Sequence, residues 1–189
     1  PTSTQSAVLQ KSDLKIQVLN GSGIAGQATI IKNDLAAIAG RAFTNPHRVL
    51  LDDAGPLPWR VPQVKADPST NKWFLRFIVL KATREIIGST SFHGVPDEQA
   101  MMEIGIGLDE KFWGKGYAKE ALLGMWRWVV TQPGVSILRY TVSPTNIASV
   151  KIIQGFGFTH IGQQIDEEDG PEDIYEMSVE DFKKKFAGE

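Results

Sequence analysis

Alternating hydrophobic and polar residues predict a β-strand near the start of the chain and several more from residue 72 onward. The first strand covers residues 14–19, with the sequence Leu-Lys-Ile-Gln-Val-Leu. The others cover residues 72–81, 85–93, 101–108, 136–142, 158–164 and 173–177. Short connections join the three runs between residues 72 and 108, so these strands are expected to form an antiparallel meander.

Apolar residues at helical spacing predict helices at residues 28–43, 118–131, 146–155 and 179–186. Asn146 and Ser178 are suitable N-caps for the last two. Between Thr44 and Thr70 five prolines exclude regular interior helix or strand, which predicts a long ordered loop with room for a short helix. The order of elements predicts an α/β (α+β) fold in which helices flank a mixed central sheet.

Composition narrows the classes of protein. At 189 residues the chain fits one domain, which we place at residues 14–189 after an N-terminal tail at 1–13. A net charge of -2 gives the protein no overall positive field to attract a polyanion, so we expect no nucleic-acid partner. The lack of cysteine excludes disulfides and thiolate metal sites. No apolar run reaches the roughly 20 residues that span a bilayer, and no secretory signal is seen, so we expect an intracellular, cytoplasmic protein. Monomer and homodimer both stay open.

Two glycine motifs compete as ligand sites. The first, Gly21–Gly26, fits G-x-G-x-x-G between a predicted strand and a predicted helix, as in dinucleotide-binding folds. That fingerprint also needs an acid at the end of a second strand about 20 residues on. The segment there, Thr44–His47, offers neither acid nor clean strand, so a simple turn is favoured over NAD binding.

The second motif, Trp113-Gly114-Lys115-Gly116-Tyr117-Ala118, follows a strand and leads directly into a helix. Its glycines let the backbone approach a ligand closely and turn N–H groups inward. The helix adds its unpaired N–H groups and the positive end of its dipole, which together suit a diphosphate. Lys115 adds a charge at the rim. Judged on local sequence alone, a tight turn without a ligand fits equally well.

A third motif lies further along, at Asn146, Ser149 and Gly157-Phe158. Together with the glycine turn it resembles the GCN5-related N-acetyltransferase (GNAT) superfamily, and more narrowly the branch of ribosomal-protein N-terminal acetyltransferases. The resemblance implies acetyl-CoA as co-substrate, no metal, and a sheet splayed between strands 101–108 and 136–142. It also implies that the pantetheine arm pairs with the backbone in that gap. The implied coenzyme contacts are Ile106, Leu108, Trp113, Gly114, Lys115, Gly116, Tyr117, Ala118, Asn146 and Ser149.

Acetyl transfer to an amine needs a base, because an alkyl amine is protonated at neutral pH. Glu103 is the leading candidate, at a position where the resembling branch often carries an acid, and an ion-paired strand carboxylate is the competing interpretation. His93 is the alternative base. Many superfamily members have a tyrosine acid seven residues after the Asn, where this chain has Ile153. Ser149 lies one turn earlier and is expected to act on the coenzyme sulfur, or only on its own helix backbone.

The acceptor is the least determined part of the site. Three aromatic residues are candidates for lining its pocket, although core packing is the commoner role for such residues: Trp59, Trp73 and Phe92. The sequence therefore predicts an acetyl-CoA-dependent N-acetyltransferase acting on a primary amine, of a small molecule or a peptide N-terminus, in a ternary complex. A non-catalytic acyl-CoA sensor on the same fold is the alternative, because the usual tyrosine is missing.

Overall fold

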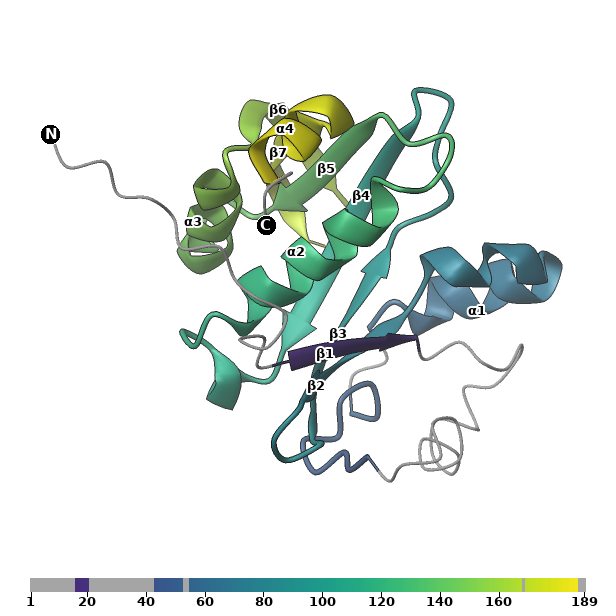
Figure 1. Cartoon of the computed structure of the whole chain (residues 1–189), viewed down its shortest axis with the longest axis vertical. Coiled ribbons are helices and arrows are strands. Elements are labelled where there is room, and N and C mark those ends of the chain that lie inside the picture. Colours follow the sequence, from purple (N-terminus) through teal and green to yellow (C-terminus); the bar gives the residue numbers. More distant parts are fainter. Residues whose placement is uncertain (1–15, 21–42, 53–54, 168, 187–189) are drawn as a thin grey trace, which may run out of the picture.

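A mixed sheet forms the centre of the molecule (Figure 1). The computed structural model describes residues 16–20, 43–52, 55–167 and 169–186, and for residues 16–20 it describes the backbone. Seven strands within these ranges pair in the order β1-β2-β3-β4-β5-β7-β6. Their bounds are β1 Ile16–Asn20, β2 Arg76–Leu80, β3 Ile86–Phe92, β4 Met101–Leu108, β5 Ile137–Val142, β6 Thr159–Asp166 and β7 Gly170–Ser178.

The predicted meander is confirmed, because β2, β3 and β4 pair antiparallel in sequence order. β1 also runs antiparallel to β2, whereas a dinucleotide fold needs a parallel neighbour. The glycine motif Gly21–Gly26 and most of the predicted helix 28–43 lie outside the described residues.

The proline-rich segment holds more helix than its prolines suggest. Helix α1 runs from Leu57 to Ala66. A 3-10 helix follows at Pro68–Trp73, and its last two residues were expected to begin a strand. The short helix that the sequence left room for is present, but the expectation that the prolines exclude a regular helix was wrong. Pro58 lies in the first turn, where no backbone N–H needs a partner. Pro62 removes one hydrogen bond from a helix that still packs through Leu57 and the buried Val64.

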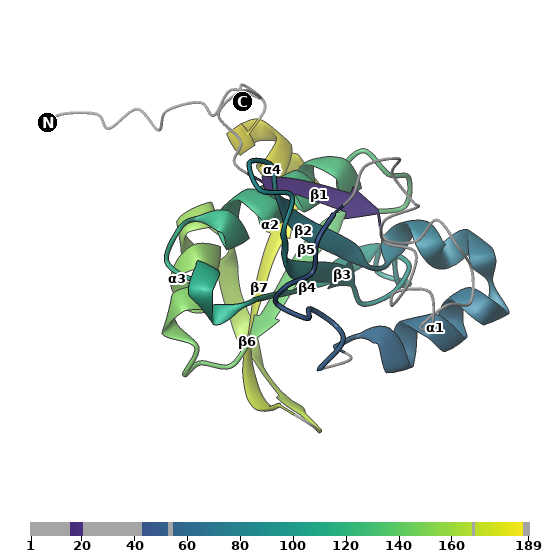
Figure 2. The same ribbon diagram turned by 90° about the horizontal axis from the view of Figure 1, so that it is seen from below.

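Helices cover both faces of the sheet. Helix α2 (Tyr117–Val129) packs on one face, where Ala121 contacts Ile78 and Ile87. On the opposite face of β2 and β3, the residues before and at the start of α1 pack against Phe77 and Val79. Figure 2 shows α1 and α2 on opposite sides of these strands. The two faces of β3 and β4 therefore have different neighbours.

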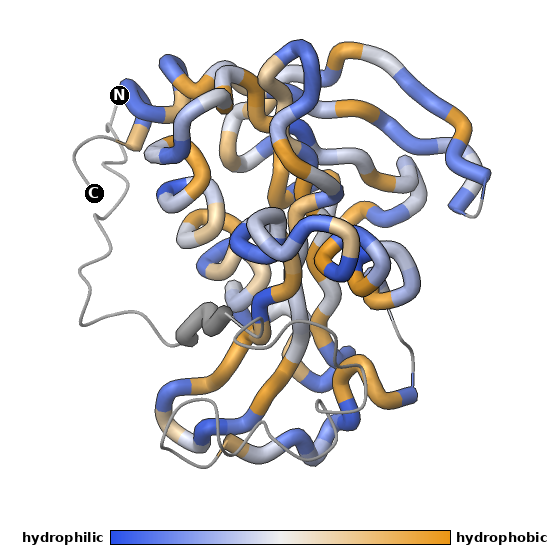
Figure 3. The backbone as a smooth tube through the Cα atoms, turned by 90° about the vertical axis from the view of Figure 1, so that its right-hand side faces the viewer, coloured by the Kyte–Doolittle hydropathy of each residue, from blue (hydrophilic) through white to orange (hydrophobic). Residues whose placement is uncertain are grey.

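The main core lies between α2 and the second half of the sheet. Trp126 is fully buried there, with ring centroids 4.8 Å from Phe156 and 4.7 Å from Phe158. Helices α3 (Ile147–Phe156) and α4 (Val179–Phe186) close this core. In Figure 3 the hydrophobic segments run through the middle of the fold and many turns are hydrophilic. No helix within the described ranges is long and apolar enough to cross a membrane.

The sheet forks between its two central strands. β4 and β5 are parallel and pair only at Met101–Ile137, Met102–Leu138 and Glu103–Arg139. Beyond Glu103 the two strands diverge, as can be followed in Figure 1. The predicted splay is thus present, and in the part of the chain that the structure describes, residues 104–108 of β4 have no strand partner on the β5 side.

Candidate active site

The glycine turn joins β4 to α2 and has the form of an anion cradle. Gly114 and Gly116 adopt φ angles of +68° and +83°, which favour glycine, and a Cβ built at either would meet nothing within 4 Å. Gly116 is also the N-cap of α2, and no side chain caps that helix start. The first amides of α2 thus lack a side-chain cap and lie beside open space, which suits a diphosphate.

Two side chains of the turn are fixed by backbone carbonyls. The Trp113 ring is 61% exposed, and its Nε1 donates to the Leu108 carbonyl at 2.9 Å. The Lys115 Nζ donates to the Lys111 carbonyl at 2.7 Å. The lysine ammonium therefore stays beside the turn as a positive charge at its rim.

The start of α3 combines capping with a pair of hydroxyl groups. The Asn146 Oδ1 accepts a hydrogen bond from the Ser149 backbone N–H at 3.1 Å, which confirms the predicted N-cap. The Ser149 side chain hydrogen-bonds with the hydroxyl of Tyr140 on β5, a buried residue. Ile153, where the superfamily often has tyrosine, is fully buried in the core.

The two roles of Asn146 can be separated by mutation. We expect Asn146→Ala to lower the free energy of unfolding by about 1 kcal/mol through loss of the cap, and Asn146→Asp to keep it. Urea denaturation measures this, with acetyl-CoA affinity titrated on the same variants. If Asn146 contacts the coenzyme and has no capping role, both variants should keep the free energy of unfolding of wild type and bind acetyl-CoA more weakly.

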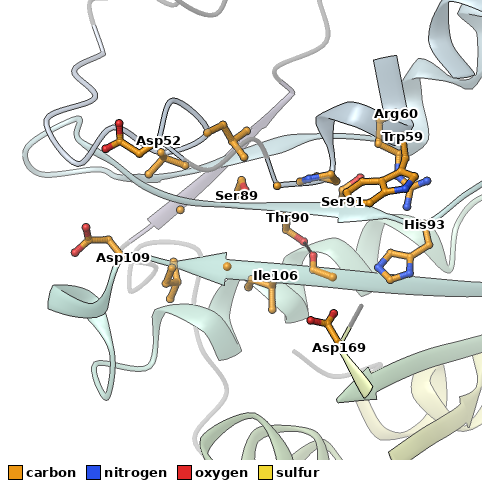
Figure 4. A pocket seen from close by; sticks show the side chains of 18 of the residues that line it. Asp52, Trp59, Arg60, Ser89, Thr90, Ser91, His93, Ile106, Asp109 and Asp169 are labelled. Atoms are coloured by element: carbon orange, nitrogen blue, oxygen red, sulfur yellow. Dashed lines mark hydrogen bonds between the residues drawn. The ribbon is translucent and has the colours of Figure 1, made fainter. Parts of the chain in front are cut away.

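A cavity of about 810 Å³ lies against β3 and β4 (Figure 4). Its floor is made of small residues, and its walls come from segments far apart in sequence. They are the loop before α1, the first turns of α1 and the tip of the β6–β7 hairpin. Polar lining residues include His47, Arg60, Ser89, Ser91, His93, Asp109, Asp166, Glu167 and Asp169.

The structure separates the three predicted acceptor aromatics. Trp59 lines the cavity and is 50% exposed. Trp73 and Phe92 are buried in the main core instead, the role that the sequence analysis gave as commoner for such residues. The strand register explains Phe92, which pairs with Ile104 and packs in the same core cluster, while its neighbours Ser91 and His93 line the cavity.

The two candidate bases, predicted as alternatives, lie side by side. The His93 Nδ1 is 3.3 Å from the Glu103 Oε1, with the two side chains 45% and 16% exposed. His93 lines the cavity and Glu103 stands behind it. A Cβ on Gly105 would lie 2.9 Å from the His93 Nε2, so the imidazole rests above a glycine.

Glu103 is held as a carboxylate. Burial acts to raise its pKa, but hydrogen bonds from His93 and Thr141 and the positive charges of His93 and Arg139 outweigh burial. The net result is a pKa below the ordinary value for glutamate. An ionised, weakly basic carboxylate behind an exposed imidazole is suited to orienting the ring and stabilising its charge.

Several site residues were missed in the sequence. Thr141 contacts Glu103 from 38 positions away, which only the parallel register could have predicted. His47 lies 3.8 Å from Asp109 at the cavity wall, and its loop position gave no signal. The acidic segment Asp166–Gly170 was interpreted only as a turn; it does join β6 to β7, and its residues Asp166, Glu167 and Asp169 also line the cavity.

Residues 30–159 match the acetyltransferase (GNAT) domain. The chain belongs to this family. Its predicted superfamily is thereby confirmed. Among GNAT relatives, the uncharacterized N-acetyltransferase p20 of Bacillus licheniformis is 31% identical over 59% of this chain and 63% of its own length. The uncharacterized N-acetyltransferase YjdG of Bacillus subtilis is 36% identical over 43% and 48%. The chain thus matches less than two thirds of either relative.

Solved GNAT structures share the fold. Ribosomal-protein-S5-alanine acetyltransferase from Vibrio fischeri has a TM-score of 0.60 at 17% identity, covering 88% of this chain and 93% of its own. The microcin C7 self-immunity acetyltransferase MccE, in complex with acetyl-CoA and AMP, has a TM-score of 0.53 at 22% identity, covering 63% and 68%. Likeness at these identities establishes the fold and leaves the acceptor open.

Proposed function

We propose that this GNAT protein transfers an acetyl group from acetyl-CoA to a primary amine, with both substrates bound together. The observation that carries the proposal is the dual use of β4. Its end leads into the glycine turn at Gly114 and Gly116, and near its start Glu103 lies against His93. A single strand thus links an anion cradle to a candidate base.

The residues present fit acetyl-CoA. The amides at the start of α2 and the rim charge of Lys115 would hold the diphosphate, and the backbone at Ile106 and Leu108 would pair with the pantetheine arm. When bound, acetyl-CoA supplies an acetyl group activated as a thioester. No other group is needed for the chemistry assigned below.

Each protonation step has a candidate residue in this chain. The acceptor ammonium loses one proton to water as it binds, His93 accepts the second at Nε2 as the amide bond forms, and the Glu103 carboxylate stabilises the resulting imidazolium. The Ser149–Tyr140 hydroxyl pair is the proposed proton donor to the departing thiolate. Burial raises the pKa of Tyr140, an effect that its hydrogen bond with Ser149 partly offsets, so the phenol keeps its proton at neutral pH.

The cavity favours an acceptor that arrives as an ammonium ion. Asp166, Glu167 and Asp169 line it from the hairpin tip. Of the two arginines that line it, Arg48 is paired with Asp52 at 2.7 Å, and the Arg60 Nη1 donates to the Gln63 Oε1 at 3.0 Å. Similar folds include a spermidine/spermine N-acetyltransferase from Vibrio cholerae and the S5-alanine acetyltransferase. Polyamines and peptides with free N-termini therefore both belong in the substrate panel.

Acetyl-CoA addition tests the proposal. At 100 times its dissociation constant the ligand should stabilise the fold by about 2.7 kcal/mol, which raises the melting temperature by roughly 5–10 °C. Thiol release should then be stimulated by at least one amine of the panel. A melting shift without amine-stimulated thiol release would instead support the acyl-CoA sensor. The observation in favour of the sensor is the buried Ile153 at the position where the superfamily often has tyrosine. With no shift at millimolar acetyl-CoA, both functions fail.

A further inference from the structure

One carboxylate oxygen joins three strands at the fork of the sheet. The Glu103 Oε1 on β4 accepts a hydrogen bond from the Thr141 hydroxyl on β5. The same oxygen lies 3.3 Å from the His93 Nδ1, just beyond the end of β3. The backbone adds to this arrangement, because the His93 N–H donates to the Glu103 carbonyl at 2.9 Å.

The location of this contact is set by the strand register. Glu103 is the last β4 residue that pairs with β5, opposite Arg139. Thr141 lies two residues further along β5, on the same face and at the point where the strands part. The Thr141–Glu103 hydrogen bond therefore spans the opening fork.

Arg139, the other neighbour on this face of β5, is engaged elsewhere. Its Nε donates to the Glu176 Oε1 on β7 at 2.8 Å. It acts on Glu103 only through its charge. Thr141 is thus the β5 residue that fixes the direction of the carboxylate.

We infer that Thr141 is a positioning residue for His93, acting through Glu103. The threonine hydroxyl holds the carboxylate across the fork, and the carboxylate holds a proton on Nδ1 of His93, which leaves Nε2 as the acceptor facing the cavity. This inference rests on the proposed function, in which His93 takes the proton of the amine.

A glutamate side chain has three rotatable bonds, so a single hydrogen-bond partner restricts the orientation of its carboxylate only weakly. Thr141 is β-branched and on a strand, which restricts its χ1 and makes it a well-defined anchor. Two other charges act on Glu103 without sharing this geometry, those of Arg60 on α1 and Arg139 on β5. The acids of the hairpin tip that line the same cavity as His93 are Asp166, Glu167 and Asp169.

The test compares Thr141→Val, which removes the hydroxyl at nearly constant shape, with Thr141→Ser, which keeps it. Thr159→Val is the matched control, a strand threonine on β6 that does not line the cavity. We expect kcat to fall about 10- to 100-fold in the valine variant, the range for a lost hydrogen bond to a charged group. The serine variant and the control should stay close to wild type. In all three variants the KM for acetyl-CoA and the melting shift that acetyl-CoA causes should not change.

A second readout does not depend on turnover. The ¹⁵N spectrum of neutral His93 should show the Nδ1–H tautomer in wild type and in Thr141→Ser, and a mixture of tautomers in Thr141→Val. The inference is overturned if the valine variant has the same kcat and the same His93 tautomer as wild type. It is also overturned if the valine variant loses coenzyme binding because its fold is lost. If wild type acetylates no amine while the tautomer responds as expected, the proposed function fails and the positioning role of Thr141 stands.

Discussion

We expect His93→Gln to lower kcat for the amine acceptor by about 10²- to 10⁴-fold, the usual contribution of a general base. Glutamine keeps a polar side chain in the cavity but cannot take up a proton. The melting shift caused by acetyl-CoA should be unchanged, because His93 lies on the cavity side of the sheet and away from the glycine turn. Steady-state kinetics at saturating acetyl-CoA, with the coenzyme shift measured in parallel, checks both parts.

The chain offers a close control for this experiment. His160 on β6 also faces a carboxylate, with its Nε2 3.3 Å from the Asp173 Oδ1, and its side chain is 47% exposed against 45% for His93. It does not line the cavity. His160→Gln should therefore keep full activity, so that a loss in both variants would indicate general damage to the sheet.

Glu103→Gln decides between the two candidate bases. If His93 is the base, removal of the negative charge destabilises the imidazolium, and Glu103→Gln lowers kcat less than His93→Gln does. If His93→Gln keeps activity and Glu103→Gln abolishes it, Glu103 takes the proton itself, as the sequence favoured. The lowered pKa of Glu103 argues for the first result, because a weakly basic carboxylate is a poor proton acceptor.

Local patterns in the sequence were enough to predict most of the elements. β4 was predicted with its observed bounds, and the caps at Asn146 and Ser178 were confirmed by hydrogen bonds to residues 149 and 181. The proline-rich segment was predicted as a loop with room for a short helix, and the extent of α1 was not predicted because the tolerance of a helix for proline depends on its packing, which no local rule includes. The β6–β7 hairpin extends further into its acidic tip than expected, because polar cross-strand pairs such as Gln164–Glu172 show no alternation of apolar residues.

The candidate site shows where sequence reasoning ends. Glu103 and His93 were both named, but as competitors, because their contact depends on the antiparallel register of β3 and β4. Phe92 was kept as a pocket candidate beside a core role because alternation along a strand does not say which face meets the helix. Thr141 depends on the parallel pairing of two strands more than thirty residues apart, and such pairing leaves no local signal.

The other large effect is expected at the glycine turn. We expect Gly116→Glu to weaken acetyl-CoA binding at least about 100-fold, a loss of about 2.7 kcal/mol. The new carboxylate would stand at the N-cap of α2, in open space where the diphosphate is expected. The φ of +83° adds strain of about 1–2 kcal/mol, partly offset by the favourable position of an acid at a helix N-terminus. Calorimetric titration and the melting shift measure the effect.

Gly124→Glu is the matched control, because it makes the same substitution eight residues along the same helix. Gly124 is exposed, and a Cβ there meets nothing within 4 Å. Replacing a helix-interior glycine should raise helix stability by up to about 1 kcal/mol and leave acetyl-CoA affinity unchanged. Gly116→Ala, which adds strain without charge, should fall between the two. If Gly116→Glu binds acetyl-CoA like wild type, the diphosphate does not sit on this turn, and β4 no longer links the coenzyme to His93.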